Sequence, residues 1–81
     1  MANKRMFALD VIDTDRFCDM PISARLLYYE LGMRGDDEGF VQNPKKIMLT
    51  TGTTADDLKI LAAKGYVILF DSGVLVITHW R

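Results

Sequence analysis

The chain has 81 residues, of which 49% are hydrophobic and 26% are charged, with a formal net charge of -1 and a pI near 5.6. This balance excludes a disordered tail, because the apolar fraction is high and the net charge is low. The pI also argues against a dedicated basic nucleic-acid binder, which would have a pI above about 9. The single Cys excludes an internal disulfide framework and a Cys-rich zinc module.

The sequence also carries no signal for a membrane or for export. No apolar run approaches the roughly 20 residues that span a bilayer, and the first residues lack the apolar stretch of a signal peptide. We therefore expect a cytoplasmic protein in a reducing compartment. The length predicts one domain, residues 1–81, and the abrupt end after Trp80-Arg81 indicates the N-terminal part of a longer protein.

The first elements are short. The apolar run from Met6 to Leu9 fits a strand or an extended arm. Asp13 and Thr14 are good N-cap residues for a short helix that ends near Asp19.

A longer helix follows the break at Pro21. Ser23 is the predicted N-cap of this helix, which runs from Ala24 to about Met33. Gly32 and Gly35 indicate that the helix ends in this stretch. Ile22 and Leu27 have the spacing of a hydrophobic staple. The expected core face has i, i+3, i+4, i+7 spacing and consists of Ala24, Leu27, Tyr28 and Leu31.

Two helices joined by a tight turn come next. After the acidic turn 36–39, Phe40-Val41 predicts a very short strand, and Asn43-Pro44 predicts a helix start. That helix runs to about Thr50, buries Ile47 and Met48, and ends at Gly52. Thr53 or Thr54 caps the next helix, Ala55 to Lys64, in which Asp56 and Asp57 complement the positive end of the helix dipole.

The chain closes with a predicted β-hairpin. Residues 66–70 and 74–78 are rich in β-branched and aromatic residues, and Asp71-Ser72-Gly73 fits a three-residue loop between them. The predicted fold class is therefore α+β, mostly α, with a winged helix-turn-helix whose C-terminal hairpin is the wing.

In such a module the second helix enters the DNA major groove. Its outward face here would hold Asp56, Lys59, Ile60 and Ala63, which match a phosphate-coated groove poorly. Phosphate contacts would instead come from basic residues spread along the chain, with Lys45 and Lys46 in the first helical turn after Pro44. The full predicted DNA-binding set is Lys4, Arg5, Lys45, Lys46, Lys59, Lys64 and Arg81.

The predicted wing has almost no charge, since Asp71 is the only Asp, Glu, Lys or Arg between Gly65 and Trp80. A wing that grips DNA would normally offer Lys or Arg, whereas an apolar patch on a small domain indicates a partner. The alternative is burial under the N-terminal arm and a missing continuation of the chain. The predicted partner interface consists of Tyr66, Ile68, Phe70, Leu75 and Ile77.

The sequence offers no pattern typical of catalysis or metal binding. The acidic turn 36–39 lacks the alternating ligands of an EF-hand loop. His79 is the only His, and Cys18 beside Phe17 is expected to be a small core residue. No Gly-rich phosphate loop follows a strand. We therefore expect a protein that is not an enzyme and holds no cofactor or metal.

Several blocks together resemble the N-terminal domain of phage replisome-organizer proteins of Gram-positive bacteria. These blocks span nearly all of the chain and are Asp13-Thr14-Asp15, Leu31-Gly32-Met33-Arg34, Asp36-Asp37-Glu38-Gly39-Phe40-Val41, Asn43-Pro44-Lys45-Lys46-Ile47 and Val76-Ile77-Thr78-His79-Trp80-Arg81. The family is similar in role to DnaD-type primosome proteins, whose N-terminal winged helices serve oligomerisation. The resemblance implies a replication module that binds phage origin DNA and self-associates into a dimer or larger assembly. It also implies that a downstream region recruits a helicase or its loader.

Two alternatives stay open. The acidic start of the second helix and the uncharged hairpin favour an oligomerisation or protein-docking module without direct DNA binding. A phage transcription regulator would share the same fold and would bind a promoter operator instead of an origin.

Overall fold

The protein is represented by a computed structural model that describes residues 9–36 and 38–78. Lys4, Arg5, His79 and Arg81 therefore lie outside the described residues. The elements of the described part, in chain order, are α1 (Leu9–Ile12), α2 (Asp15–Cys18), α3 (Ile22–Arg34), β1 (Phe40–Val41), α4 (Pro44–Thr51), α5 (Ala55–Ala63), β2 (Val67–Leu69) and β3 (Leu75–Ile77).

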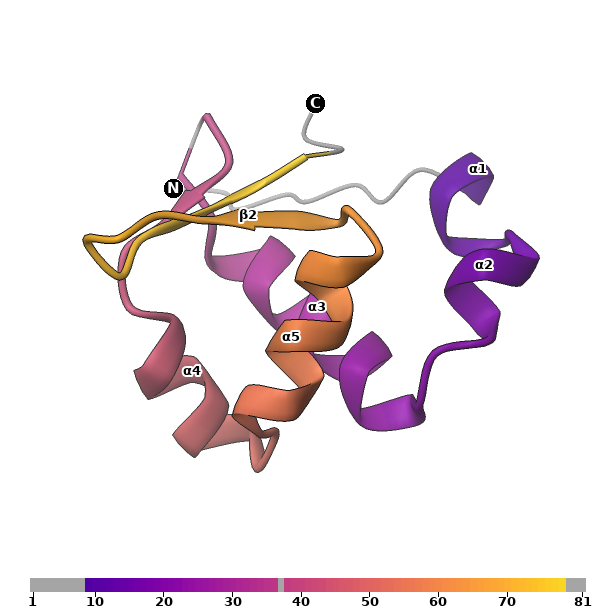
Figure 1. Ribbon diagram of the computed structural model, residues 1–81, viewed down its shortest axis with the longest axis horizontal. Coiled ribbons are helices and arrows are strands. Elements are labelled where there is room, and N and C mark those ends of the chain that lie inside the picture. Colours follow the sequence, from indigo (N-terminus) through magenta and orange to yellow (C-terminus); the bar gives the residue numbers. More distant parts are fainter. Residues whose placement is uncertain (1–8, 37, 79–81) are drawn as a thin grey trace.

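The strands form one antiparallel sheet in the order β1-β3-β2. Phe40 pairs with Val76 on one side of β3, and Ile68 pairs with the same residue on the other. The sheet lies along one side of α3, α4 and α5 (Figure 1). The predicted α+β class, mostly helical, is confirmed, and the short strand at residues 40–41 is the edge that ties the middle of the chain to its C-terminal hairpin.

The buried face of α3 follows the predicted pattern. Ala24, Leu27, Tyr28 and Leu31 are all buried. The predicted helix start is wrong by two residues: α3 begins at Ile22 with Pro21 as the N-cap. Ser23 does not cap this helix, because its hydroxyl donates to Asp57 of α5 instead (Oγ to Oδ1, 2.7 Å). The staple does not form either, because Ile22 is 77% exposed.

The helix pair α4–α5 is set by local signals that the sequence already contains. Pro44 occupies the first turn of α4, and Gly52 ends the helix in the left-handed conformation with φ 77°. Thr54, one of the two predicted caps, begins α5 with a capping box: its hydroxyl accepts from the Asp57 N–H, and the Asp57 carboxylate accepts from the Thr54 N–H. The loop between the helices is therefore short and conformationally fixed.

An aromatic cluster joins the N-terminal helices to the rest of the core. The Phe17 ring meets Tyr28 edge to face at 5.2 Å and Tyr66 at 5.6 Å between ring centroids. Such edge-to-face pairs stabilise beyond simple area burial. Cys18, predicted to lie in the core, is exposed, because α2 turns its neighbour Phe17 inward instead. Leu9, expected in a strand or an extended arm, is the first residue of α1 and is exposed.

The hairpin has the predicted three-residue loop. The Phe70 N–H donates to the Val74 carbonyl over 2.9 Å, and Gly73 closes the loop with φ 91°. Only Gly adopts this conformation without strain. Both strands are shorter than residues 66–70 and 74–78, and Tyr66 precedes β2 as a buried core residue.

Candidate nucleic-acid interface

The start of α4 is the part of the described structure that best suits an anion. Lys45 and Lys46 lie in its first turn, and both side chains are exposed. Asn43 makes no side-chain capping bond, and no acidic residue lies in this turn. The first N–H groups of a helix lack intrahelical partners and carry the positive end of the helix dipole. Backbone and side chains therefore present positive charge in the same place.

A cleft of about 280 Å³ opens beside this helix start. The end of α3, the strand β1 and one face of α4 form its walls, which consist of Arg34, Asp36, Phe40, Val41, Gln42, Asn43, Lys46, Ile47 and Thr50. The cleft is thus mixed in character, with two cations, one acid and an aromatic ring.

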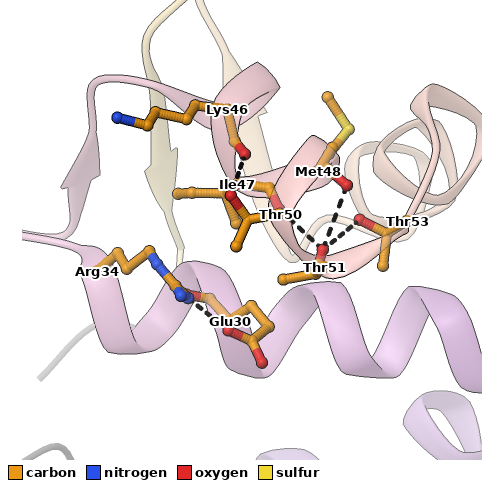
Figure 2. A network of polar contacts seen from close by, with 8 residues as sticks. All are labelled: Glu30, Arg34, Lys46, Ile47, Met48, Thr50, Thr51 and Thr53. Carbon is orange, nitrogen blue, oxygen red and sulfur yellow. Dashed lines mark hydrogen bonds and ion pairs between the residues drawn. The ribbon is translucent and has the colours of Figure 1, made fainter.

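The two cations of the cleft are not equivalent. Figure 2 shows the Arg34 guanidinium directed at Glu30, one turn earlier on α3, and this is the one ion pair within residues 9–36 and 38–78. Arg34 also donates to the Glu30 carbonyl over 3.1 Å. The Lys46 side chain is drawn extended, and no contact joins its Nζ to the other residues of the figure. Lys46 is therefore the more accessible charge for a phosphate.

The acid of the cleft is held by the backbone. Asp36 Oδ1 accepts from the Glu38 N–H at 2.8 Å and from the Phe40 N–H at 3.0 Å. These two bonds hold Oδ1 of the carboxylate in the turn before β1. The acidic turn therefore has a structural role, and no group of His, Cys, Asp or Glu in the described part of the chain could hold a metal ion.

The structure places Lys64 in a second, separate cleft. This cleft measures about 350 Å³ and is lined by Asp10, Val11, Thr14, Arg16, Lys64 and Tyr66. Arg16 Nη2 donates to the Lys64 carbonyl at the end of α5, and the guanidinium lies 5.9 Å from the centroid of the Tyr66 ring. A cation is favourable at a helix C-terminus, which explains the position of Arg16.

The predicted cations are therefore only partly brought together. Lys45 and Lys46 share one turn, Lys59 is exposed on the outer face of α5, and Lys64 borders the other cleft. The predicted contacts at Lys4, Arg5 and Arg81 lie outside the described residues. Sequence reasoning missed Arg34 and Arg16. Arg34 carried a weak signal as the last basic residue before a turn, whereas Arg16 bonds to a carbonyl 48 residues away.

The predicted partner interface divides into two groups. Tyr66, Leu75 and Ile77 are buried, at 3%, 0% and 4% exposure, so they cannot face a partner. Leu75 and Ile77 are buried because β3 is the central strand and directs alternate side chains into the core. Tyr66 is buried because its ring packs on Phe17 and Tyr28. Ile68 and Phe70 are about half exposed, and Leu69, absent from the predicted set, accompanies them. The Phe70 ring also stacks on Phe40 with centroids 6.3 Å apart.

The start of α5 carries a buried acid instead of a base. Asp57 is 6% exposed and accepts from Ser23 and Thr54. Burial raises the pKa of the Asp57 carboxyl, but the hydrogen bonds from Ser23 and Thr54 outweigh burial and hold it below its usual value. Asp57 therefore stays ionised and links α5 to α3. The charged residues on the exposed side of α5 are Asp56 and Lys59.

Comparisons with known proteins identify no relative. No protein-family model, curated protein or solved structure matches the chain. Within the described residues, no helix has the length and apolar character needed to cross a membrane.

Proposed function

We propose that the chain is a winged helix-turn-helix module of a phage DNA replication initiation protein, which contacts DNA phosphates and self-associates. In this reading α4 and α5 are the helix-turn-helix, and the β2–β3 hairpin is the wing. The observation that carries the DNA-binding part is the start of α4. There Lys45 and Lys46 stand exposed in an uncapped first turn with no acidic neighbour in that turn.

The chemistry favours contact with the phosphate backbone over base reading. A helix N-terminus binds phosphate through its free N–H groups and its dipole, and adjacent Lys side chains add charge. The outer face of α5 has Asp56 exposed at its beginning, which repels phosphate in the position where a recognition helix would meet the groove. We therefore expect weak, salt-sensitive binding with little sequence preference from this module alone.

The test is a fluorescence-anisotropy titration of a labelled duplex at several salt concentrations. The variant Lys45→Gln/Lys46→Gln should weaken binding and lower the slope of log affinity against log salt by about 2, since each phosphate contact contributes about 0.9. The charge-matched comparison is Lys59→Gln/Lys64→Gln, which removes two other lysines of the predicted DNA-binding set, one on the outer face of α5 and one at its end, and should cost less affinity. Equal losses in both double variants would show diffuse attraction and count against an α4 site. No binding by the wild-type chain at low salt would reject DNA contact altogether.

A second candidate is a protein-docking module that does not touch DNA. The observation favouring it is the exposed apolar end of the hairpin, where Ile68, Leu69 and Phe70 are 50%, 45% and 46% exposed. Ile68 and Phe70 are two residues apart and share one face of the hairpin, and exposed apolar surface of this kind marks interaction sites. This candidate is preferred if the chain fails to bind DNA while Ile68→Asp abolishes association with a partner chain.

A further inference from the structure

The helix α3 has a second apolar face, opposite the one that packs in the core. Ile22, Leu26 and Met33 are 77%, 41% and 48% exposed. Tyr29 between them is half-buried: one side of its ring packs edge to face on Phe17 of α2, with centroids 5.8 Å apart, and the rest belongs to the outer stripe. At 100° per residue these four side chains fall within an arc of about 60°. The buried residues Leu27 and Leu31 lie on the other side of the helix.

The spacing of this outer stripe is that of a helix–helix seam. Successive members are four, three and four residues apart, which corresponds to the d, a, d and a positions of a heptad. A hollow of about 300 Å³ runs beside its first two turns and is lined by Phe17, Ile22, Arg25, Leu26 and Tyr29. Because Phe17 of α2 forms one wall, the hollow lies between α2 and α3, and its open side can accept a side chain from a second copy.

The charges beside the stripe indicate what faces it. Arg25 occupies the g position on one flank, and Glu30 occupies the e position on the other. In a parallel pair of helices the g residue of one helix meets the e residue five positions later in its partner. Arg25 of one copy would thus meet Glu30 of a second copy, and symmetry makes this contact twice. An antiparallel pair would bring g beside g and would leave the two charges unmatched.

The existing contacts of these two side chains allow the new pair. Arg25 uses its Nε–H for the Met20 carbonyl at 3.1 Å, and a guanidinium has further N–H donors. Glu30 binds Arg34 through Oε1, and a carboxylate offers about four acceptor sites. Neither contact within the chain has to break for the contact between copies to form.

We propose that two copies of this chain associate through a parallel pairing of their α3 helices, with Ile22, Leu26, Tyr29 and Met33 in the seam. The inference rests on the self-association in the proposed function and moves its interface from the hairpin to α3. The seam is only about 17 Å long, so the dimer is weak and concentration-dependent.

Sedimentation equilibrium of the 81-residue chain over a wide concentration range tests the proposal. The wild type should dimerise, and Leu26→Asp should raise the dimer Kd at least about tenfold. Leu49→Asp is the matched control, because Leu49 is 85% exposed on α4, away from the stripe, and it should leave the Kd unchanged. Circular dichroism checks that each variant remains folded.

Charge reversal tests the parallel orientation. Arg25→Glu and Glu30→Arg should each weaken the dimer, because each places like charges opposite one another, and the double variant should restore it. A double variant that dimerises no more tightly than the single variants would overturn the parallel arrangement.

A wild-type chain that remains monomeric would overturn both the α3 interface and the self-association. The anisotropy titration tests DNA contact separately. Loss of the dimer in Ile68→Asp but not in Leu26→Asp would overturn the α3 interface alone and leave self-association through the hairpin.

Discussion

At the scale of single residues, Asp57 connects two helices that are distant in sequence. Its Oδ1 accepts from Ser23 of α3 at 2.7 Å, and its Oδ2 accepts from the Thr54 N–H at 3.0 Å. One buried carboxylate thus closes the capping box of α5 and fastens that helix to the beginning of α3. Ser23 looked like a helix cap in the sequence because its true partner lies 34 residues further on.

Replacing Asp57 should destabilise the chain. Asp57→Asn keeps the shape of the side chain but removes the negative charge that strengthens the hydrogen bonds from Ser23 and Thr54 and that complements the positive end of the α5 dipole. We expect the free energy of unfolding to fall by about 1–3 kcal/mol, measured by urea denaturation. Asp56→Asn is the control, because Asp56 is exposed in the same turn, and it should change stability by less than about 0.5 kcal/mol. Equal effects of the two variants would show that the buried contacts add nothing.

The same residue predicts a dependence of stability on pH. The pKa of Asp57 in the folded chain lies below the ordinary value of 3.8. Its contribution is therefore complete above the unfolded pKa and is lost as the pH falls through the folded pKa. Urea denaturation between about pH 2 and pH 6 should show stability decreasing below about pH 4, and Asp57→Asn should decrease less steeply than the wild type. Parallel curves for the two proteins would contradict this role.

At the scale of elements, the turn between α4 and α5 depends on Gly52. Its φ of 77° is left-handed, and a Cβ added there would meet no atom within 4 Å. Conformation, and not space, therefore requires glycine at this position.

Gly52→Ala should lower stability by about 1 kcal/mol in thermal or urea denaturation. Gly52→Asn should lose less, because Asn adopts the left-handed conformation more readily than Ala. A larger loss for Asn than for Ala would show that the turn is limited by space and not by conformation.

The two faces of the hairpin should differ sharply in their effect on stability. Leu75 is fully buried in the central strand, and Leu75→Ala should cost about 2–5 kcal/mol, enough to unfold much of a chain this small. Ile68→Ala, on the half-exposed side of β2, should cost about 1 kcal/mol. Thermal unfolding of both variants measures the difference. A loss of stability in Leu75→Ala as small as in Ile68→Ala would contradict the burial of Leu75 and would favour its predicted role as a partner contact.

At the scale of the whole molecule, local signals predicted more than distant ones. Pro44, Gly52 and Thr54 mark the limits of α4 and α5, because a proline in the first turn, a left-handed end and a side-chain cap are each decided by neighbouring residues. The hairpin loop was predicted for the same reason. Pairing across the chain was not predictable: nothing in the sequence joins Arg16 to the Lys64 carbonyl.

The candidate site shows the same difference between local signals, which could be predicted, and distant contacts, which could not. The exposed lysine pair at the start of α4 follows from one turn of helix, and the sequence alone placed it. The burial of Leu75 and Ile77 follows from β3 being the central strand, flanked by β1 and β2. Apolar composition could not separate the side chains that pack inside from those that remain exposed.

We propose that DNA contacts this chain at the start of α4, and one experiment reads that contact residue by residue. The most direct measurement is an amide chemical-shift titration of the isotope-labelled chain with a short duplex at low salt. We expect the largest shifts at Lys45, Lys46 and the cleft-lining Thr50. Shifts confined to the β2–β3 hairpin, or no shifts at any duplex concentration, would contradict it.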